Sequence, residues 1–198
     1  MTDFAFGALT AISAMGVLFL ITCAFGWVKI TGFVLNAGII IESLILMAAI
    51  AVFEEVVSRG YILQTLRSGY GTAAAVIINS AIFASLHFSN AGGRSLAALS
   101  GIFAAGIVLS YAYITTKRLW LPIGIHFGWN LALGPIFGFR VSGNDLPSLI
   151  QLHSNGPTWW LGGKFGPESG LWAIAALILI AIALHRYNAS SAAQDSSS

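Results

Sequence analysis

The chain has 198 residues, of which 57% are hydrophobic and only 8% are charged, and its mean hydropathy is +0.85. Such values exceed those of a soluble domain and predict an integral membrane protein. The formal net charge of +2, carried by scattered basic residues, argues against nucleic acid as a partner. With Cys23 as its one cysteine, the chain has neither an intrachain disulfide framework nor a CxxC metal site.

Six apolar segments predict the fold class, an all-α polytopic transmembrane helix bundle of about six spans. The segments cover residues 4–28, 33–57, 72–88, 95–116, 119–139 and 171–184. Most connections between them are short, which favours antiparallel neighbouring helices. We therefore expect one multi-pass membrane domain over residues 1–187, followed by a disordered polar tail over residues 188–198.

The longest connection covers residues 140–170 and is rich in Gly and Pro. Its adjacent Trp159 and Trp160 favour an interfacial loop, because tryptophan concentrates where a membrane meets water. A lid over a binding site is the alternative. Basic residues are divided four against four between the loops of the two sides, so they set the orientation only weakly, with a slight preference for both termini inside.

The most unusual feature of the sequence is a group of three charges, Glu54, Glu55 and Arg59, at the end of the second apolar segment. A charge at membrane depth costs about 2.5–3.5 kcal/mol on insertion scales, so it is retained for structure or for function. Residues four apart share a helix face, whereas adjacent residues diverge by about 100°. We therefore predict an ion pair between Glu55 and Arg59 that leaves Glu54 free. The alternative is that both acids share Arg59 at a helix end.

Later segments contain groups that could work with a free acid. His87 ends the third segment, while His126 and Asn130 share a face of the fifth. A carboxylate and an imidazole can deprotonate a water, and imidazole and amide N–H groups can stabilise an oxyanion, so these residues favour hydrolysis of an amide. A metal site stays open, because Glu with two His is a known hydrolytic zinc ligand set, although no HExxH motif occurs.

These side chains can meet only if the helices are suitably arranged. Along straight helices, Glu54 and His87 would lie about 20–24 Å from the turn at residues 67–71, whereas His126 would lie only about 12 Å from Arg118. The helices must therefore be offset, tilted or broken. Pro122, one turn before His126, offers a place for a kink.

Three short motifs of charged, aromatic and polar residues follow one another on successive apolar segments. They are Glu54-Glu55-x-x-x-Arg59, Phe83-x-x-x-His87 and His126-x-x-x-Asn130. In this order they resemble the motifs of the CAAX prenyl protease type II and bacteriocin-processing family of intramembrane endopeptidases, also called CPBP or Abi. The resemblance covers residues 45–133.

The resemblance implies an intramembrane endopeptidase in which Glu54 and His87 activate a water. The resemblance also implies that His126 and Asn130 form the oxyanion hole that stabilises the tetrahedral intermediate. The supporting residues implied by the motifs are Glu55, Arg59 and Phe83. The family is often labelled a metalloprotease, so a divalent metal such as zinc, held by Glu54, His87 and His126, stays open although the sequence requires no cofactor.

Ser58 stands where the family often has an aromatic residue before Arg59. Because Ser58 follows Glu54 by four residues, we expect its hydroxyl to hydrogen-bond that carboxylate, which would make Ser58 a further supporting residue.

The resemblance also implies a membrane-associated peptide or protein substrate, contact with the lipid bilayer, and a place in the cell membrane of a prokaryote. Two other functions remain open on the residues alone. The polar groups could hold the spans of a non-proteolytic immunity or scaffold protein together through interhelical hydrogen bonds. They could also line a small transporter or ion path that runs past Glu54.

Overall fold

The computed structural model describes residues 2–195 and confirms an all-α, membrane-type helix bundle. Its principal helices, in chain order, are α1 (Thr2–Ala24), α2 (Ala37–Glu55), α3 (Leu63–Leu86), α4 (Leu96–Thr116), α5 (Trp120–Leu131) and α7 (Leu171–Asp195). Two π-helices, η1 (Val56–Ile62) and η2 (Ala132–Ile136), extend α2 and α5. Among the residues described, four helical stretches are long and apolar enough to cross a membrane: Thr2–Ala24, Ala37–Leu86, Leu96–Thr116 and Leu171–Ala189.

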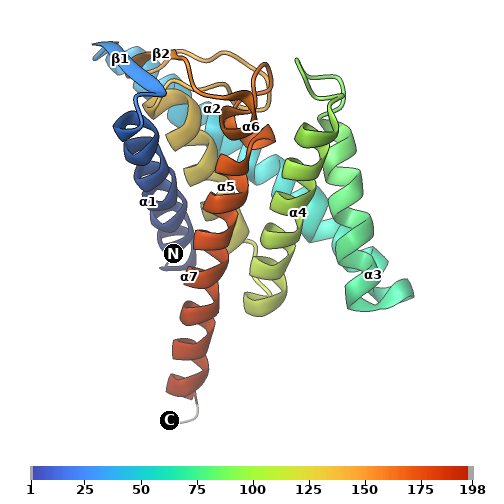
Figure 1. Ribbon diagram of the computed structural model, residues 1–198. Coiled ribbons are helices and arrows are strands. Elements are labelled where there is room, and N and C mark those ends of the chain that lie inside the picture. Colours follow the sequence, from blue (N-terminus) through green and yellow to red (C-terminus); the bar gives the residue numbers. More distant parts are fainter. Residues whose placement is uncertain (1, 196–198) are drawn as a thin grey trace.

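The helices run alternately up and down between the two ends of the bundle (Figure 1). Helix α1 begins and α7 ends at the same end, which fits an even number of crossings. Helix α2 runs obliquely behind α4 and α7, so its middle reaches the centre of the bundle (Figure 1). From the sequence we expected that the helices must be offset, tilted or broken for the motif residues to meet, and α2 is tilted.

The stretch Ala37–Leu86 contains both the second and the third of the predicted segments. Helix α2 continues through η1 into α3 with little interruption until Gly71, whose φ of 77° and ψ of 170° are not helical. Glycine reaches positive φ at little steric cost, so the chain can turn sharply at this point. The single stretch therefore consists of two helical arms (Figure 1).

A small antiparallel sheet of two strands, which the sequence analysis did not predict, lies at one end of the bundle. Strand β1 (Val28–Phe33) pairs with β2 (Ile150–Ser154), so the segment 140–170 is not a loop throughout. It also contains the short helices α6 (Thr158–Leu161) and η3 (Pro167–Ser169).

Both tryptophans of this segment make contacts that fix its place. The indole N–H of Trp160 donates to the Thr22 hydroxyl at 3.2 Å. The ring of Trp159 is largely exposed and stands edge-on to Trp27, with 5.8 Å between ring centroids. An interfacial position for Trp159 stays a prediction.

Helix boundaries differ from the predicted ones at several places. Helix α2 begins at Ala37, where the side chain of Asn36 accepts a hydrogen bond from the Gly38 N–H at 2.8 Å and so caps the helix. Pro122 lies in the first turn of α5, where no N–H is needed, and does not kink the helix. Helix α7 continues into residues 188–195, which we had expected to be disordered, and residues 196–198 lie outside the described part.

Helix α5 is held in place by an unusually close approach to α1. A Cβ atom at Gly7, Gly124 or Gly128 would lie inside contact distance of backbone atoms on the facing helix. Gly124 and Gly128 are four residues apart, so they form the small-residue face that allows two membrane helices to pack backbone to backbone. This packing fixes α5, which carries His126 and Asn130.

The glycine face can be tested with the substitution Gly124→Ala. The added methyl would overlap backbone atoms of Phe4 and force α1 and α5 apart, at a cost of about 1–3 kcal/mol. We expect a clear fall in the thermal unfolding temperature of the protein in detergent. The matched control is Gly69→Ala, since a Cβ at Gly69 meets no atom within 4 Å. Equal unfolding temperatures for the two variants would contradict the proposed packing.

Candidate active site

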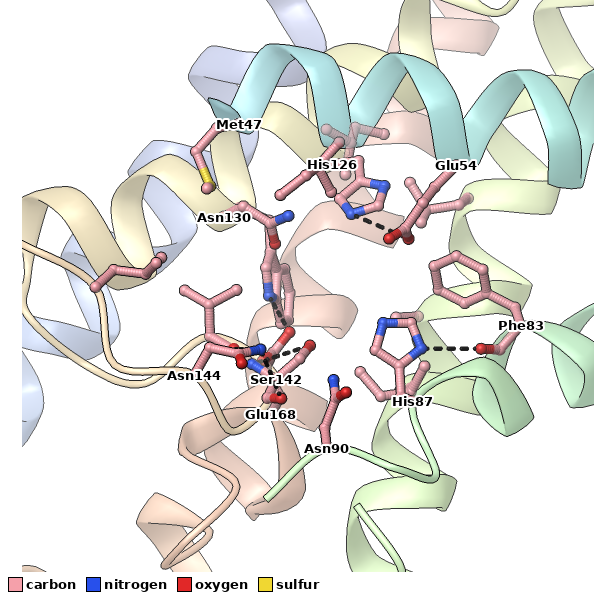
Figure 2. A pocket seen from close by; sticks show the side chains of 18 of the residues that line it. Met47, Glu54, Phe83, His87, Asn90, His126, Asn130, Ser142, Asn144 and Glu168 are labelled. Carbon is pink, nitrogen blue, oxygen red and sulfur yellow. Dashed lines mark hydrogen bonds and ion pairs between the residues drawn. The ribbon is translucent and has the colours of Figure 1, made fainter. Parts of the chain in front are cut away.

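The motif residues meet around one partly open cavity of about 400 Å³ (Figure 2). Its walls come from α2, α3, α4, α5, α7 and the segment between α5 and α7. The lining includes the following side chains that the sequence had singled out: Glu54, Phe83, His87, His126 and Asn130. Groups up to 76 residues apart in the chain therefore line the same cavity.

A buried ion pair lies beside the cavity. The Arg59 guanidinium donates through Nη1 to Oε1 of Glu55 at 2.8 Å, and both side chains are fully buried. This confirms the pair predicted from their spacing of four residues. In the described part of the chain, Glu54 makes no ion pair with Arg59. The alternative in which both acids share the arginine is therefore wrong.

Arg59 is held by further contacts with two other helices. Its Nη2 donates to the carbonyl oxygen of Gly106 in α4 at 3.1 Å. Its guanidinium carbon lies 4.5 Å from the centre of the Phe83 ring in α3, within cation–π range. The arginine thereby connects η1 to α3 and α4, which is the kind of pairing that a charge in the interior of a membrane protein requires.

Ser58 contacts a different partner from the one predicted. Its hydroxyl donates to the side-chain oxygen of Asn79 at 3.1 Å, whereas we had expected a bond to the carboxylate of Glu54. The hydroxyl of the buried Ser58 is directed at α3, whereas Glu54 lines the cavity. Asn79 in turn donates to the hydroxyl of Ser110, which donates to the carbonyl of Gly106. Ser58 thus belongs to a polar chain between helices.

Glu55 also binds His126, a contact that the sequence did not predict. The Nδ1 atom of His126 lies 2.9 Å from the same Oε1 that accepts from Arg59. Because this oxygen is an acceptor, Nδ1 carries a proton and donates it. The second ring nitrogen, Nε2, is left on the side of Glu54, whose Oε2 lies 3.9 Å away.

The charges of this group can balance. Glu54 and Glu55 contribute two negative charges and Arg59 one positive charge, so a protonated His126 brings the sum to zero. A neutral total matters here because an unpaired charge in a low-dielectric interior costs several kcal/mol. The structure therefore suits an imidazolium at His126, with Nδ1–H directed to Glu55 and Nε2–H available to the cavity.

The two groups predicted to activate water both face the cavity (Figure 2). Glu54 comes from the last turn of α2, and its Oε2 is buried without a hydrogen-bond partner among the described residues. His87 is the C-terminal cap of α3, and its Nδ1 lies 3.0 Å from the carbonyl oxygen of Phe83. A carbonyl can only accept, so Nδ1 is the protonated nitrogen and Nε2 is free to act as an acceptor.

Asn130 lies one turn after His126 on α5 and is 95% buried, with an exposed fraction of 5%. Its amide is directed into the cavity (Figure 2) and makes no hydrogen bond to another described residue. Phe83 packs against both histidine rings, at 5.2 Å from His87 and 6.1 Å from His126 between ring centroids. The structure thus places the predicted oxyanion-hole pair on the same helix face, with Phe83 between the histidines.

A second buried acid of the cavity, Glu168 in η3, was missed by the sequence analysis. Its Oε1 accepts from the indole N–H of Trp129 at 3.1 Å, and its Oε2 accepts from the backbone N–H and the hydroxyl of Ser142. Burial raises the pKa of Glu168, while these hydrogen bonds and the nearby His87 act in the opposite direction. No motif marked this residue, since it lies alone in a segment that we had expected to be an interfacial loop.

The metal alternative finds no assembled ligand set in this conformation. Over residues 2–195, no three His, Cys, Asp or Glu side chains are grouped closely enough to hold a metal ion, and this applies to Glu54, His87 and His126. The free Nε2 atoms of the two histidines are nonetheless the kind of donor that zinc accepts.

The chain was compared with known families, with curated proteins and with solved structures. The family model described as type II CAAX prenyl endopeptidase, Rce1-like, matches residues 35–132, a region that contains Glu54, His87, His126 and Asn130. Neither the curated proteins nor the solved structures gave a significant match. The match and the apolar helices agree in indicating an integral membrane protease of the CAAX type. The chain belongs to the Rce1-like family of type II CAAX prenyl endopeptidases.

Proposed function

We propose that the chain is an intramembrane endopeptidase that hydrolyses a peptide bond with a water activated by Glu54 and His87. The observation that carries the proposal is one cavity lined by a carboxylate, two imidazoles and a buried amide, in which Oε2 of the carboxylate, Glu54, has no hydrogen-bond partner among the described residues. The substrate would be a membrane-embedded peptide or protein segment. We also propose that the protein itself lies in the plasma membrane of a prokaryote.

The hydrogen-bonding state of the side chains fits the first step. A water can donate one hydrogen to Glu54 and the other to Nε2 of His87, which leaves an oxygen lone pair for attack on the substrate carbonyl. As the new C–O bond forms, the water proton passes to Glu54. When the C–N bond breaks, this proton passes to the leaving nitrogen, and the carboxylate is restored.

The oxyanion that forms in this step would be bound by His126 and Asn130. The amide of Asn130 supplies an N–H donor, and Nε2–H of His126 supplies the second when the ring is protonated. Glu55 favours that protonated state because it already accepts from Nδ1. Glu55 and Arg59 would therefore act as a brace that orients His126, while Phe83 would keep the two histidine rings apart.

The first prediction concerns the water-activating pair. We expect Glu54→Gln and His87→Ala each to lower peptide cleavage by purified protein at least about 100-fold, the usual contribution of a general base. The matched control is Glu42→Gln, which changes an exposed acid on the same helix and should leave turnover unchanged. Product formation by mass spectrometry is the measurement.

Wild-type turnover in both Glu54→Gln and His87→Ala would rule out the proposed catalysis. The non-proteolytic alternative, an immunity or scaffold protein of the same fold, would then be favoured if alanine substitutions in the cavity lowered thermal stability and biological protection in parallel. A Glu54-dependent ion flux in liposomes would instead favour the transport alternative.

The second prediction separates the two adjacent acids. Glu55→Gln leaves Arg59 and His126 without their shared anion, and breaking a buried pair costs about 3–5 kcal/mol. We therefore expect a large fall in unfolding temperature for Glu55→Gln and a clearly smaller fall for Glu54→Gln, because Glu54 is partly exposed and its one ion-pair contact, with His126 at 3.9 Å, is not a hydrogen bond. Both are measured by thermal unfolding in one detergent. Indistinguishable losses of stability would show that the division between brace and catalyst is wrong.

The third prediction concerns metal dependence. Because the proposed steps use only side chains and water, we expect peptide cleavage to survive dialysis against a strong chelator. The protein dialysed against buffer alone is the control. Loss of turnover with the chelator, followed by recovery with added zinc, would favour the metal-bound version of the site with Glu54, His87 and His126 as ligands.

A further inference from the structure

Two acids that line the cavity, Asp145 and Glu168, have no part in the proposed catalysis, and of these Glu168 is the buried one. It lies outside residues 35–132, the region matched by the family, and only 4% of its surface is exposed. Helix α4 also packs tightly on it, since a Cβ at Gly101 would overlap the Glu168 carbonyl oxygen. The carboxylate is therefore held rigidly in the cavity wall, between α4, α5 and the start of α7.

The hydrogen bonds around Glu168 suit an ionised carboxylate that can accept one more donor. Trp129 and Ser142 supply three N–H and O–H donors in all, two of them to Oε2 and one to Oε1. A carboxylate offers about four acceptor positions, so about one position remains, on Oε1. All of these partners are neutral, and they leave the negative charge itself uncompensated.

No described lysine or arginine is available to neutralise this charge, and His87 is the nearby basic group that acts on it. Among the described residues, neither Lys nor Arg lines the cavity, and Glu168 forms no ion pair. The nearest arginine along the segment, Arg140, is held by both carboxylate oxygens of Asp145, at 2.8 and 2.9 Å, and by the carbonyl of Lys164. Burial raises the pKa of Glu168, so its charge is costly in the protein alone, and a positive group that arrives from outside the protein would offset this cost.

The position of Glu168 within the cavity adds to this argument. Leu46, Met47 and Ile50 of α2 and Ile102 and Ala105 of α4 form apolar walls of the cavity. Glu168 lies at another side, near Asn90, Ser142 and Asn144 (Figure 2). This side is close to the end of the bundle where α3 ends and α7 begins (Figure 1). The cavity therefore joins an apolar region to an anionic one near an end of the helices.

The amide of Asn130 gives independent evidence that the cavity receives a ligand. It is more than nine-tenths buried, faces the same space and has no hydrogen bond to a described residue. The N–H of this amide could donate to the carbonyl of a bound peptide. The cavity thus contains an acceptor, the Glu168 carboxylate, and a donor, the Asn130 amide. A peptide with a basic side chain could use the first for its side chain and the second for a backbone carbonyl.

We propose that Glu168 is a specificity site for a basic residue of the substrate. The peptide would place an apolar segment between α2 and α4 and a Lys or Arg side chain against Oε1 of Glu168. This inference rests on the proposed function for its choice of a peptide as ligand. It also implies that a peptide with an acidic group at that position is rejected, because two carboxylates would then share one buried site.

Binding can be measured without cleavage in the Glu54→Gln background, which keeps Glu168. The probes are fluorescent Leu/Ala peptides in which a single Lys is moved along the sequence, each with a norleucine and a glutamate counterpart. We expect at least one position at which Lys binds about tenfold more tightly than norleucine, and norleucine more tightly than glutamate, as a partly desolvated charge pair allows. Fluorescence anisotropy in detergent gives the dissociation constants.

Two variants then separate charge from structure. Adding Glu168→Gln keeps the size of the side chain and should reduce the Lys preference to below about twofold. Adding Trp129→Phe removes one donor to Glu168 but keeps its charge, so the preference should remain. Thermal unfolding of each variant reports whether it is folded, and the order of the three peptides on protein with an intact Glu168 tests the inference even if Glu168→Gln does not fold.

Equal binding of the Lys, norleucine and glutamate peptides at every position would overturn the inference, as would a Lys preference that survives Glu168→Gln. These results are distinct from a failure of the proposed function. Absence of cleavage by the wild-type protein, together with a Glu168-dependent Lys preference, would reject the protease and keep the binding site. Cleavage without any charge preference would reject the binding site and keep the protease.

Discussion

One carboxylate oxygen, Oε1 of Glu55, is the point on which the site depends. It accepts from Arg59 and from His126, so it joins η1 to α5 in the interior of the bundle. Arg59 extends the connection to α4 through the carbonyl of Gly106. Since a membrane interior provides no water for these groups, each charge is stable only while the others are present. The brace thereby fixes the ring of His126 and leaves the adjacent Glu54 free.

Helix α5 serves two purposes because its residues divide between opposite faces. Gly124 and Gly128 lie against the backbone of α1, while His126 and Asn130, each two residues later, face the cavity. An offset of two residues turns about 200° around a helix, so a close backbone contact on one side positions the polar groups on the other. The positions of His126 and Asn130 therefore depend on the contact between α1 and α5, in which glycine meets backbone and no polar side chain takes part.

Local spacing was enough to predict a contact between neighbouring turns of the helical chain, and it failed where a side chain found its partner on another helix. The Glu55–Arg59 pair followed from a separation of four residues, whereas Ser58 was assigned to the wrong partner because its hydroxyl bonds Asn79 on α3, a contact with no local signal. The contact between Glu55 and His126 spans 71 residues and has no local signal. Glu168 was missed because a lone acid in a Gly- and Pro-rich segment looks like surface until tertiary packing buries it.

The charge count connects the brace, the catalytic acid and the proposed specificity site. Glu54, Glu55, Arg59 and a protonated His126 sum to zero, so this group is complete without a ligand. Glu168 then adds one negative charge that no described Lys or Arg neutralises. A basic substrate side chain would restore neutrality in the whole cavity, and the attraction would act at a distance from the bond to be cleaved. Recognition by charge and hydrolysis by Glu54 would in this way use different carboxylates, which lets the catalytic one remain free for water.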